Sequence, residues 1–328
     1  MIAKETTMKI DVSQDSFPLK SAFRISRGSK TTADVVTVKL TRNGVQGWGE
    51  CVPYARYGET VESVIEQLQS VPPHITRAEL IETLPAGAAR NALDCAIWDL
   101  KAKKTNSRVW QLANLPKPKP VQTAFTLSLD TVENMTRAAA QNAHRPILKL
   151  KLGTPDDLDR LVAVRNAAQD AKLVIDANEG WTIDDYHMLI DHLVDMDIAL
   201  IEQPFPAGQD ACLTDLDRPI PICADESVHN SADLPALLGK YDCVNIKLDK
   251  SGGLTAAIDL KAKSQAIGFG IMVGCMVGTS LAMAPAQLLA SDATLVDLDG
   301  PLLLAKDRVI PISYDARGMH PAPAELWG

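Results

Sequence analysis

The sequence predicts an α/β protein in which a (β/α) barrel follows an N-terminal α+β domain. Three observations support this fold class. A hairpin pattern followed by helical stretches occupies the first 118 residues, a proline-rich segment ends that region, and short apolar runs then alternate with helical stretches as far as residue 300. The length of 328 residues is enough for two such units.

The N-terminal domain begins with a predicted antiparallel hairpin. Residues 34–40 alternate in polarity and are rich in β-branched side chains, and residues 45–51 return with a similar pattern. Between them Asn43 and Gly44 supply the two residues that a type I′ turn requires.

Two helices are expected after the hairpin, over residues 60–71 and 86–104, because apolar side chains recur there at helical spacing. Residues 115–122, LPKPKPVQ, contain prolines that disfavour a helix. We therefore place a domain boundary near residue 118, with residues 1–118 in the first domain and 119–300 in the barrel.

The barrel prediction depends on a regular spacing of strand ends. The apolar runs are ILKLK, LVID, ALIE, PICAD, CVNIK, GIMVG and TLVDLD, and residues 121–128 supply one more strand at the start. The polar residues that end six of the runs are Lys151, Asp176, Glu202, Asp225, Lys247 and Asp297. Their separations are 25, 26, 23, 22 and 50 residues, the last being two units of 25, whereas one βα unit of a barrel takes roughly 25 to 30 residues. The tail, residues 301–328, adds no unit and is expected to fold back onto the first domain.

Composition narrows the class of partner. The formal net charge is -8 and no Lys/Arg-rich run exists, which argues against nucleic acid or an anionic membrane and favours a small-molecule substrate. The six cysteines form no CxxC pair, and the start of the chain lacks the apolar stretch of a signal peptide. We expect reduced thiols and a cytoplasmic protein.

Three acidic residues end consecutive predicted strands, in VIDANEGW, LIEQPFP and CADES: Asp176, Glu202 and Asp225. The C-terminal ends of barrel strands meet at one face, where such enzymes place their chemistry. Three carboxylates that repel one another require a cation, and an all-oxygen donor set selects a hard ion such as Mg²⁺. We therefore predict a magnesium site formed by these residues.

Lysines flank this site on both sides. Lys149 and Lys151 are two residues apart and share one face of a strand, where enclosure of like charges is expected to depress the pKa of at least one amine. Lys247 ends a strand on the opposite side of the predicted site, and strand alternation would put Asp249 on the same face. Two bases on opposite faces of a substrate are the arrangement that inverts a stereocentre.

A second acidic pair, Asp297 and Asp299 in LVDLDGP, also shares one face, and such a pair would suit a substrate ammonium. A turn or capping role is the alternative for either residue alone.

The motifs KLK, DANEGW, EQPFP, ADES and NIKLDKSGGL together resemble the enolase superfamily, in its muconate-lactonizing-enzyme-like branch, over nearly the whole chain. The resemblance implies a (β/α)7β TIM-like barrel with an N-terminal α+β capping domain that the C-terminal tail completes. It also implies one Mg²⁺ per subunit at the carboxylate triad and acid/base roles for Lys151 and Lys247. Lys149 would then tune Lys151 and contact the substrate carboxylate.

The segments LDLDGP, GCMVGTS, PYARYGE and PAGAARNALDCAIWDL look like those of bacterial L-Ala-D/L-Glu epimerases, which implies a dipeptide substrate and a place in murein-peptide recycling. In that family the acidic pair matching Asp297 and Asp299 holds the free amine. An arginine of the first loop meets the glutamate side chain, and both Arg24 and Arg27 are candidates here. The alternatives are an o-succinylbenzoate synthase or muconate cycloisomerase on the same scaffold, or a non-catalytic barrel. A second copy of the chain, in a homo-oligomer, is included among the expected partners.

Overall fold

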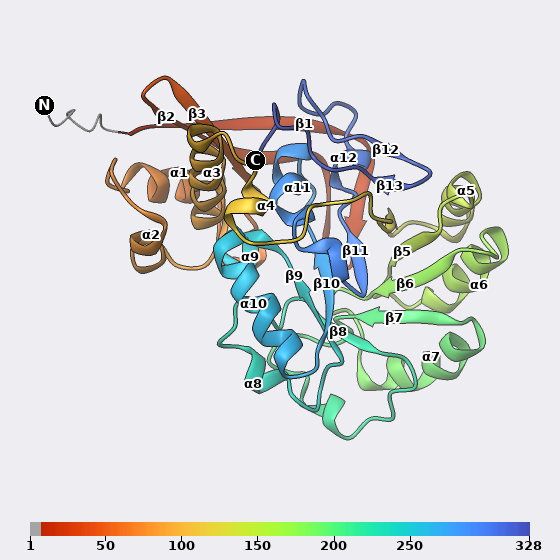
Figure 1. Cartoon of the computed structure of the whole chain (residues 1–328). Coiled ribbons are helices and arrows are strands. Elements are labelled where there is room, and N and C mark those ends of the chain that lie inside the picture. Colours follow the sequence, from red (N-terminus) through yellow and green to blue (C-terminus); the bar gives the residue numbers. More distant parts are fainter. Residues whose placement is uncertain (1–7) are drawn as a thin grey trace, which may run out of the picture.

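The computed structural model describes residues 8–328, which form an antiparallel sheet above an eight-stranded parallel barrel (Figure 1). The antiparallel strands are β1 (Lys9–Ile25), β2 (Gly28–Arg42) and β3 (Val45–Cys51), in spatial order β1-β2-β3. The barrel strands are β4 (Phe125–Leu127), β5 (Ile147–Lys151), β6 (Lys172–Asp176), β7 (Ile198–Glu202), β8 (Ile222–Ala224), β9 (Cys243–Ile246), β10 (Gly270–Gly274) and β11 (Leu295–Asp297). A short ribbon of β12 (Tyr314–Asp315) and β13 (Gly318–Met319) lies in the tail.

The helices cover both units. Beside the antiparallel sheet are η1 (Ala55–Tyr57), α1 (Val61–Gln69), α2 (Arg77–Thr83), α3 (Ala88–Thr105) and α4 (Val109–Leu112). Around the barrel are α5 (Val132–Asn142), α6 (Asp157–Ala167), α7 (Ile183–Asp195), η2 (Ala211–Thr214), α8 (Leu234–Leu237), α9 (Leu248–Ser251), α10 (Leu254–Ala266), α11 (Ser280–Gln287), η3 (Ala290–Asp292) and α12 (Gly300–Leu303). None of these helices is long and apolar enough to cross a membrane within residues 8–328.

The predicted hairpin is present as β2 and β3. Asn43 and Gly44 both adopt positive φ, 53° and 79°, as a type I′ turn requires. Strand β1 was not predicted from the sequence, and every side chain on it is exposed or half-buried. Its pairing with β2 shifts register between Pro18 and Phe23, where the sheet reaches towards the barrel.

Helix α3 packs very closely on β3. A Cβ atom at Gly49 would lie 2.0 Å from the carbonyl oxygen of Ala92, and one at Gly47 would lie 2.4 Å from that of Ala96. Glycine on the strand and alanine on the helix are therefore what bring this helix to the sheet, and both surfaces are buried in one apolar core.

The barrel strands run parallel and in sequence order from β4 to β11. The barrel nearly closes where Ala124 N donates to Val296 O at 2.8 Å and Leu298 N donates to Thr123 Oγ1 at 2.8 Å. Its interior is a packed layer of side chains rather than a channel: Val174, Leu200, Cys223, Cys243, Met272 and Leu295. The predicted α/β class, a barrel with an N-terminal antiparallel sheet over it, is confirmed.

The tail reaches the antiparallel sheet through Arg308. Its guanidinium donates to Glu50 Oε2 at 2.7 Å, to Asp15 Oδ2 at 3.0 Å and to Thr37 Oγ1 at 2.7 Å. Glu50 is fully buried, so this arginine neutralises a carboxylate that the sheet encloses.

Candidate active site and metal centre

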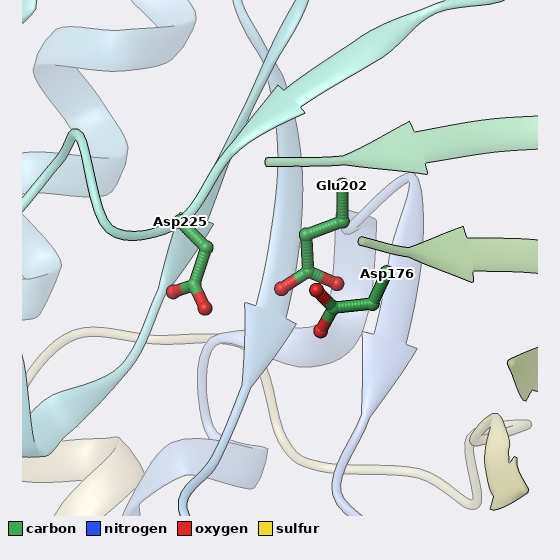
Figure 2. Close-up of side chains that lie close together, drawn as sticks. All are labelled: Asp176, Glu202 and Asp225. Carbon is green, nitrogen blue, oxygen red and sulfur yellow. The ribbon is translucent and has the colours of Figure 1, made fainter. Parts of the chain in front are cut away.

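Three carboxylates converge at the C-terminal ends of β6, β7 and β8 (Figure 2). Asp176 and Glu202 are the last residues of β6 and β7, and Asp225 directly follows β8. All three are at most 2% exposed, and oxygens from all three lie within 4.8 Å of one another. This is the cluster that the spacing of strand ends predicted.

The donor set fits a hard divalent cation. Within residues 8–328 the buried Glu202 Oε2 accepts no hydrogen bond, although Lys149 Nζ lies 2.6 Å away. Asn245 Nδ2 donates to the other oxygen, Oε1, at 2.7 Å and so orients the carboxylate. Carboxylate oxygens together with water and substrate oxygen are the ligands that Mg²⁺ prefers, so the residues present fit this ion.

Lys149 and Lys151 lie on β5, and both are buried. Lys149 Nζ lies 2.6 Å from Glu202, 2.7 Å from Asp297 and 3.1 Å from Asp176. Lys151 Nζ donates to Asp176 Oδ2 at 2.5 Å. Burial alone would lower the pKa of Lys149, but the surrounding carboxylates outweigh it and hold that pKa well above its usual value. The expected depression of at least one of the two lysine pKa values is thus not seen at Lys149, which contacts three carboxylates.

Lys247 stands on the other side of the triad. It directly follows β9, and its Nζ donates to Asp225 Oδ2 at 2.6 Å. Lys151 and Lys247 thus bond to the two outer members of the triad, one to Asp176 and one to Asp225. Lys250 adds a second ammonium, 2.5 Å from Asp225 Oδ1.

Asp249 does not share the face of Lys247, because the chain turns into the short helix α9 after the strand. Its Oδ1 accepts hydrogen bonds from Val52 N at 3.0 Å and Asn91 Nδ2 at 2.8 Å. Asp249 therefore joins the barrel to the segment after β3 and to α3 instead of entering the site.

A cavity of about 560 Å³ opens between the N-terminal sheet and the barrel. The β1–β2 turn, β2, the β3–α1 loop and the segment after β10 enclose it from one side. From the barrel side Lys151, Lys247 and Asp225 all line it. Its size suits a small-molecule ligand.

The two candidate arginines lie in different surroundings. Arg24 is 45% exposed, and its guanidinium pairs with Asp130 at 2.5 Å outside this cavity. Arg27 lines the cavity, but its guanidinium already pairs with Glu226 at 2.6 Å and Glu179 at 2.9 Å. Contact of either arginine with a substrate stays a prediction.

Lys30 is a cation that the sequence analysis did not single out. Lys30, Thr32 and Asp34 alternate along β2 and all line the cavity. Within residues 8–328 the Lys30 ammonium makes no hydrogen bond or ion pair, and burial lowers its pKa. Lys30 and Lys151 both line this cavity, and the like charge of Lys151 also lowers the pKa of Lys30.

Asp297 and Asp299 are buried beneath the site. Asp297 pairs with Lys149, leaving its Oδ1 buried without a partner in the part of the chain that the structure describes. Asp299 accepts a hydrogen bond from Thr126 N at 2.6 Å. Burial and the adjacent Asp297 raise the pKa of Asp299 to about 7. Their contact with a substrate amine stays a prediction.

Two family models together span most of the chain. Residues 7–113 match the mandelate racemase/muconate lactonizing enzyme N-terminal domain, and residues 130–304 match the enolase C-terminal domain-like model.

Curated relatives match along nearly their full length. The N-acetyl-D-glutamate racemase of Pseudoalteromonas sp. is 47% identical over 300 residues, 90% of this chain and 95% of that protein. The L-Ala-D/L-Glu epimerase of Escherichia coli K12 is 43% identical over 317 residues, 95% of this chain and 99% of that protein. Both names describe an epimerase or racemase of an amino acid derivative.

Solved structures of enolase family members are also similar to this chain. One is an enolase family member from Agrobacterium tumefaciens with homology to dipeptide epimerases, solved with bound sodium and L-Ala-L-Glu. It is 48% identical, with a TM-score of 0.96, and the match covers 98% of this chain and 100% of that one. A dipeptide epimerase from Cytophaga hutchinsonii complexed with Mg and D-Ala-L-Val is 26% identical with a TM-score of 0.90, covering 98% of this chain and 94% of that one. The chain therefore belongs to the mandelate racemase/muconate lactonizing enzyme family of the enolase superfamily.

Proposed function

We propose that this protein is a dipeptide epimerase that interconverts L-Ala-L-Glu and L-Ala-D-Glu by moving the proton on the glutamyl α-carbon. The observation that carries the proposal is the placement of Lys151 and Lys247. Both line one cavity, and they bond to opposite outer members of the carboxylate triad.

In this mechanism the two lysines act from opposite faces of the α-carbon. One neutral amine removes the α-proton, and the other, as an ammonium, returns a proton from the opposite face, so that the stereocentre inverts. Lys149 holds positive charge beside the triad in both directions of the reaction.

The α-proton of a carboxylate is too weakly acidic for an amine to remove unaided. Asp176, Glu202 and Asp225 would hold Mg²⁺, whose positive charge would stabilise the negative charge that develops on the substrate carboxylate. The β1–β2 turn and the β3–α1 loop would exclude water from the same space.

The substrate side chain would meet the N-terminal sheet. The ammonium of Lys30, which has no ion-pair partner within residues 8–328, faces a cavity whose two arginines, Arg27 and Arg56, already pair with Glu179 and Glu226. We therefore add Lys30 to Arg24 and Arg27 as a candidate partner of the glutamyl γ-carboxylate. Asp297 and Asp299 would hold the ammonium of the first residue.

A second candidate is racemisation of N-acetylglutamate, favoured by the 47% identity to a racemase of that compound. The two substrates share the glutamyl group and differ in the nitrogen substituent. An acetyl group carries no ammonium, so the buried acidic pair near Lys149 favours the dipeptide.

Proton NMR in D₂O with Mg²⁺ separates these candidates. The loss of the α-proton signal would be followed for L-Ala-L-Glu, L-Ala-D-Glu, N-acetyl-D-glutamate and N-succinyl amino acids. We expect fast exchange and epimerisation of the two dipeptides. Exchange that is fastest with N-acetyl-D-glutamate would replace the proposal with the second candidate.

The division of the chain near residue 118, with residues 301–328 completing the first domain, is also proposed. So is a cytoplasmic location, which the six unpaired cysteines support. Assembly into a homo-oligomer and a role in murein-peptide recycling complete the proposal.

A further inference from the structure

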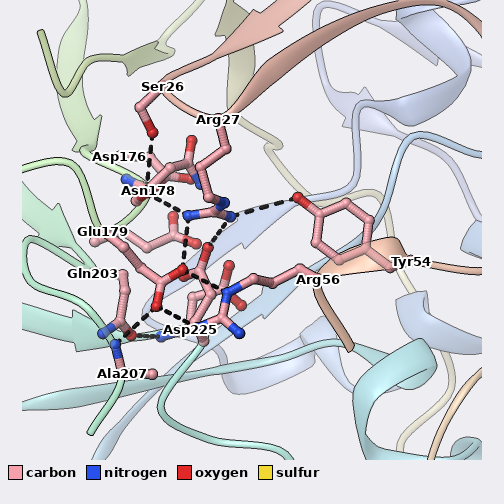
Figure 3. Close-up of polar contacts among 12 residues, drawn as sticks. Ser26, Arg27, Tyr54, Arg56, Asp176, Asn178, Glu179, Gln203, Ala207 and Asp225 are labelled. Atoms are coloured by element: carbon pink, nitrogen blue, oxygen red, sulfur yellow. Dashed lines mark hydrogen bonds and ion pairs between the residues drawn. The ribbon is translucent and has the colours of Figure 1, made fainter. Parts of the chain in front are cut away.

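The carboxylate of Glu179, at the rim of the barrel, accepts hydrogen bonds from both loops of the N-terminal sheet that close the cavity (Figure 3). Glu179 accepts two hydrogen bonds from Arg56, from Nε at 3.0 Å and from Nη2 at 2.9 Å. Its Oε2 also accepts from Arg27 Nη1 at 2.9 Å. Arg27 belongs to the β1–β2 turn and Arg56 to the β3–α1 loop, so segments that are far apart in the sequence meet at a single side chain.

The barrel backbone is shaped to hold Glu179 in this place. Asn178 and Glu179 follow the metal-ligand strand β6 with positive φ values of 46° and 66°, a conformation that costs energy in residues other than glycine. Glu179 N donates to Gln203 O at 2.9 Å, and Ala207 N donates to Glu179 Oε1 at 2.8 Å. These bonds hold Glu179, whose side chain is only 5% exposed, against the loop after β7.

Both loops bring positive charge to carboxylates at the barrel rim. Arg27 and Arg56 meet Glu179, and Arg27 also meets Glu226 at 2.6 Å, so two guanidinium groups face two carboxylates. Each guanidinium helps to hold the Glu179 carboxylate in place for the other, although the two like charges repel each other. Tyr57 gives the β3–α1 loop one more contact, with its ring centroid 4.5 Å from that of His229.

We propose that Glu179 is a positioning residue that docks both loops on the barrel rim and couples their closure over Lys151 and Lys247. It contacts no reacting atom. The inference deepens the proposed epimerase function and rests on it for its kinetic consequence, whereas the docking itself does not depend on the identity of the substrate.

Limited trypsin digestion tests the docking directly, because trypsin cleaves after Arg27 and Arg56. In the wild-type protein both bonds should resist cleavage. In Glu179→Gln, which keeps the shape and removes the charge, we expect cleavage at both bonds to become roughly tenfold faster or more, since charge-assisted hydrogen bonds are lost. A matched control is Asp259→Asn, which removes the exposed ion pair of Asp259 with Lys263, 2.8 Å long, on α10.

Coupling is tested by Arg56→Ala, which leaves the β1–β2 turn intact. If Glu179 couples the loops, cleavage after Arg27 accelerates in this variant too. Unchanged cleavage after Arg27 would overturn the coupling, and protection of both bonds in Glu179→Gln would overturn the docking. A thermal melt that matches the wild type shows that faster cleavage is local, whereas cleavage spread over the barrel would also overturn the proposal.

Steady-state kinetics with L-Ala-L-Glu supply the functional readout. We expect Glu179→Gln to lower kcat/KM by about tenfold, mainly through a higher KM, because the cavity is less often closed around the substrate. A kcat/KM equal to that of the wild type would overturn the role in the reaction. A wild-type protein that turns over no dipeptide would instead refute the proposed substrate, and the digestion result would still stand.

Discussion

Asp249 should make the stability of the folded chain fall as the pH rises. It is buried at the junction between barrel and N-terminal sheet, where burial, together with the charges of Glu59 and Glu50, raises the pKa of its carboxyl to about 7 from 3.8. Hydrogen bonds from Val52 and Asn91 offset only part of this rise in pKa. The unfolded chain releases the proton near 3.8 and the folded chain near 7, so between these values the unfolded state binds fewer protons and stability decreases with pH.

The magnitude follows from the size of the shift. A rise of about three pKa units corresponds to a change of about 4 kcal/mol at most in the free energy of unfolding. The folded chain has lost all of this stability once the pH has risen past about 7. The change Asp249→Asn removes the ionisation and keeps an acceptor oxygen, because both neighbours donate to Oδ1 alone. We expect the variant to be more stable than the wild type by about 1 to 4 kcal/mol at pH 8 and equal to it near pH 4.

Urea unfolding at both pH values, with and without the substitution, measures this difference. The control is Asp259→Asn, whose exposed carboxylate should give no comparable dependence on pH. Equal stability of wild type and Asp249→Asn at pH 8, or a variant that is less stable at both pH values, would refute the reasoning.

Three further predictions concern the site. Lys149→Met leaves buried Glu202 and Asp297 without their paired cation, so we expect the free energy of unfolding in urea without metal to fall by about 3 to 5 kcal/mol, and Mg²⁺ to restore part of it. An unchanged value would contradict a stabilising role for the Lys149 ammonium. Removal of divalent cations with EDTA should abolish turnover and lower Tm, and added Mg²⁺ should restore both; full activity in EDTA would exclude the metal role. Lys30→Ala should raise KM for L-Ala-L-Glu by roughly tenfold or more, because a charge-assisted hydrogen bond is lost. Lys30→Arg keeps the charge and should change KM by no more than a few fold. Equal KM values for the two variants in steady-state kinetics would remove Lys30 from the substrate site.

The sequence predicted the barrel and the metal triad because both follow from position along the chain. Parallel strands of a barrel present their C-terminal ends at one face, so regular spacing alone brings Asp176, Glu202 and Asp225 together. The hairpin turn was equally local, since Asn43 and Gly44 carry the positive φ values that it needs.

Contacts between the two units could not be predicted in the same way. Lys30 lines the cavity only because β2 lies over the barrel, and no sequence motif or spacing of residues indicates this position. The pairing of Arg27 and Arg56 with Glu179 joins segments 152 and 123 residues apart. One signal was present, because DANEGW carries an acidic residue next to a glycine where the chain must turn sharply, but its partners depend on the docked loops.

The position of Asp249 shows a different limit. Strand alternation was extended past the end of β9, but the chain enters α9 after Lys247. A polar run such as KLDKS ends a strand as readily as it continues one, and only the tertiary contacts of α9 decide between them.

In the proposed mechanism two lysines act from opposite faces of one carbon. The most direct measurement follows deuterium incorporation and epimerisation by Lys151→Ala and Lys247→Ala in D₂O, each with L-Ala-L-Glu and L-Ala-D-Glu separately. Both variants should lose epimerisation, and each should exchange the α-proton of one epimer only, the two variants choosing opposite epimers. Epimerisation at the wild-type rate by either variant, or exchange of the same epimer by both, would contradict the two-base account.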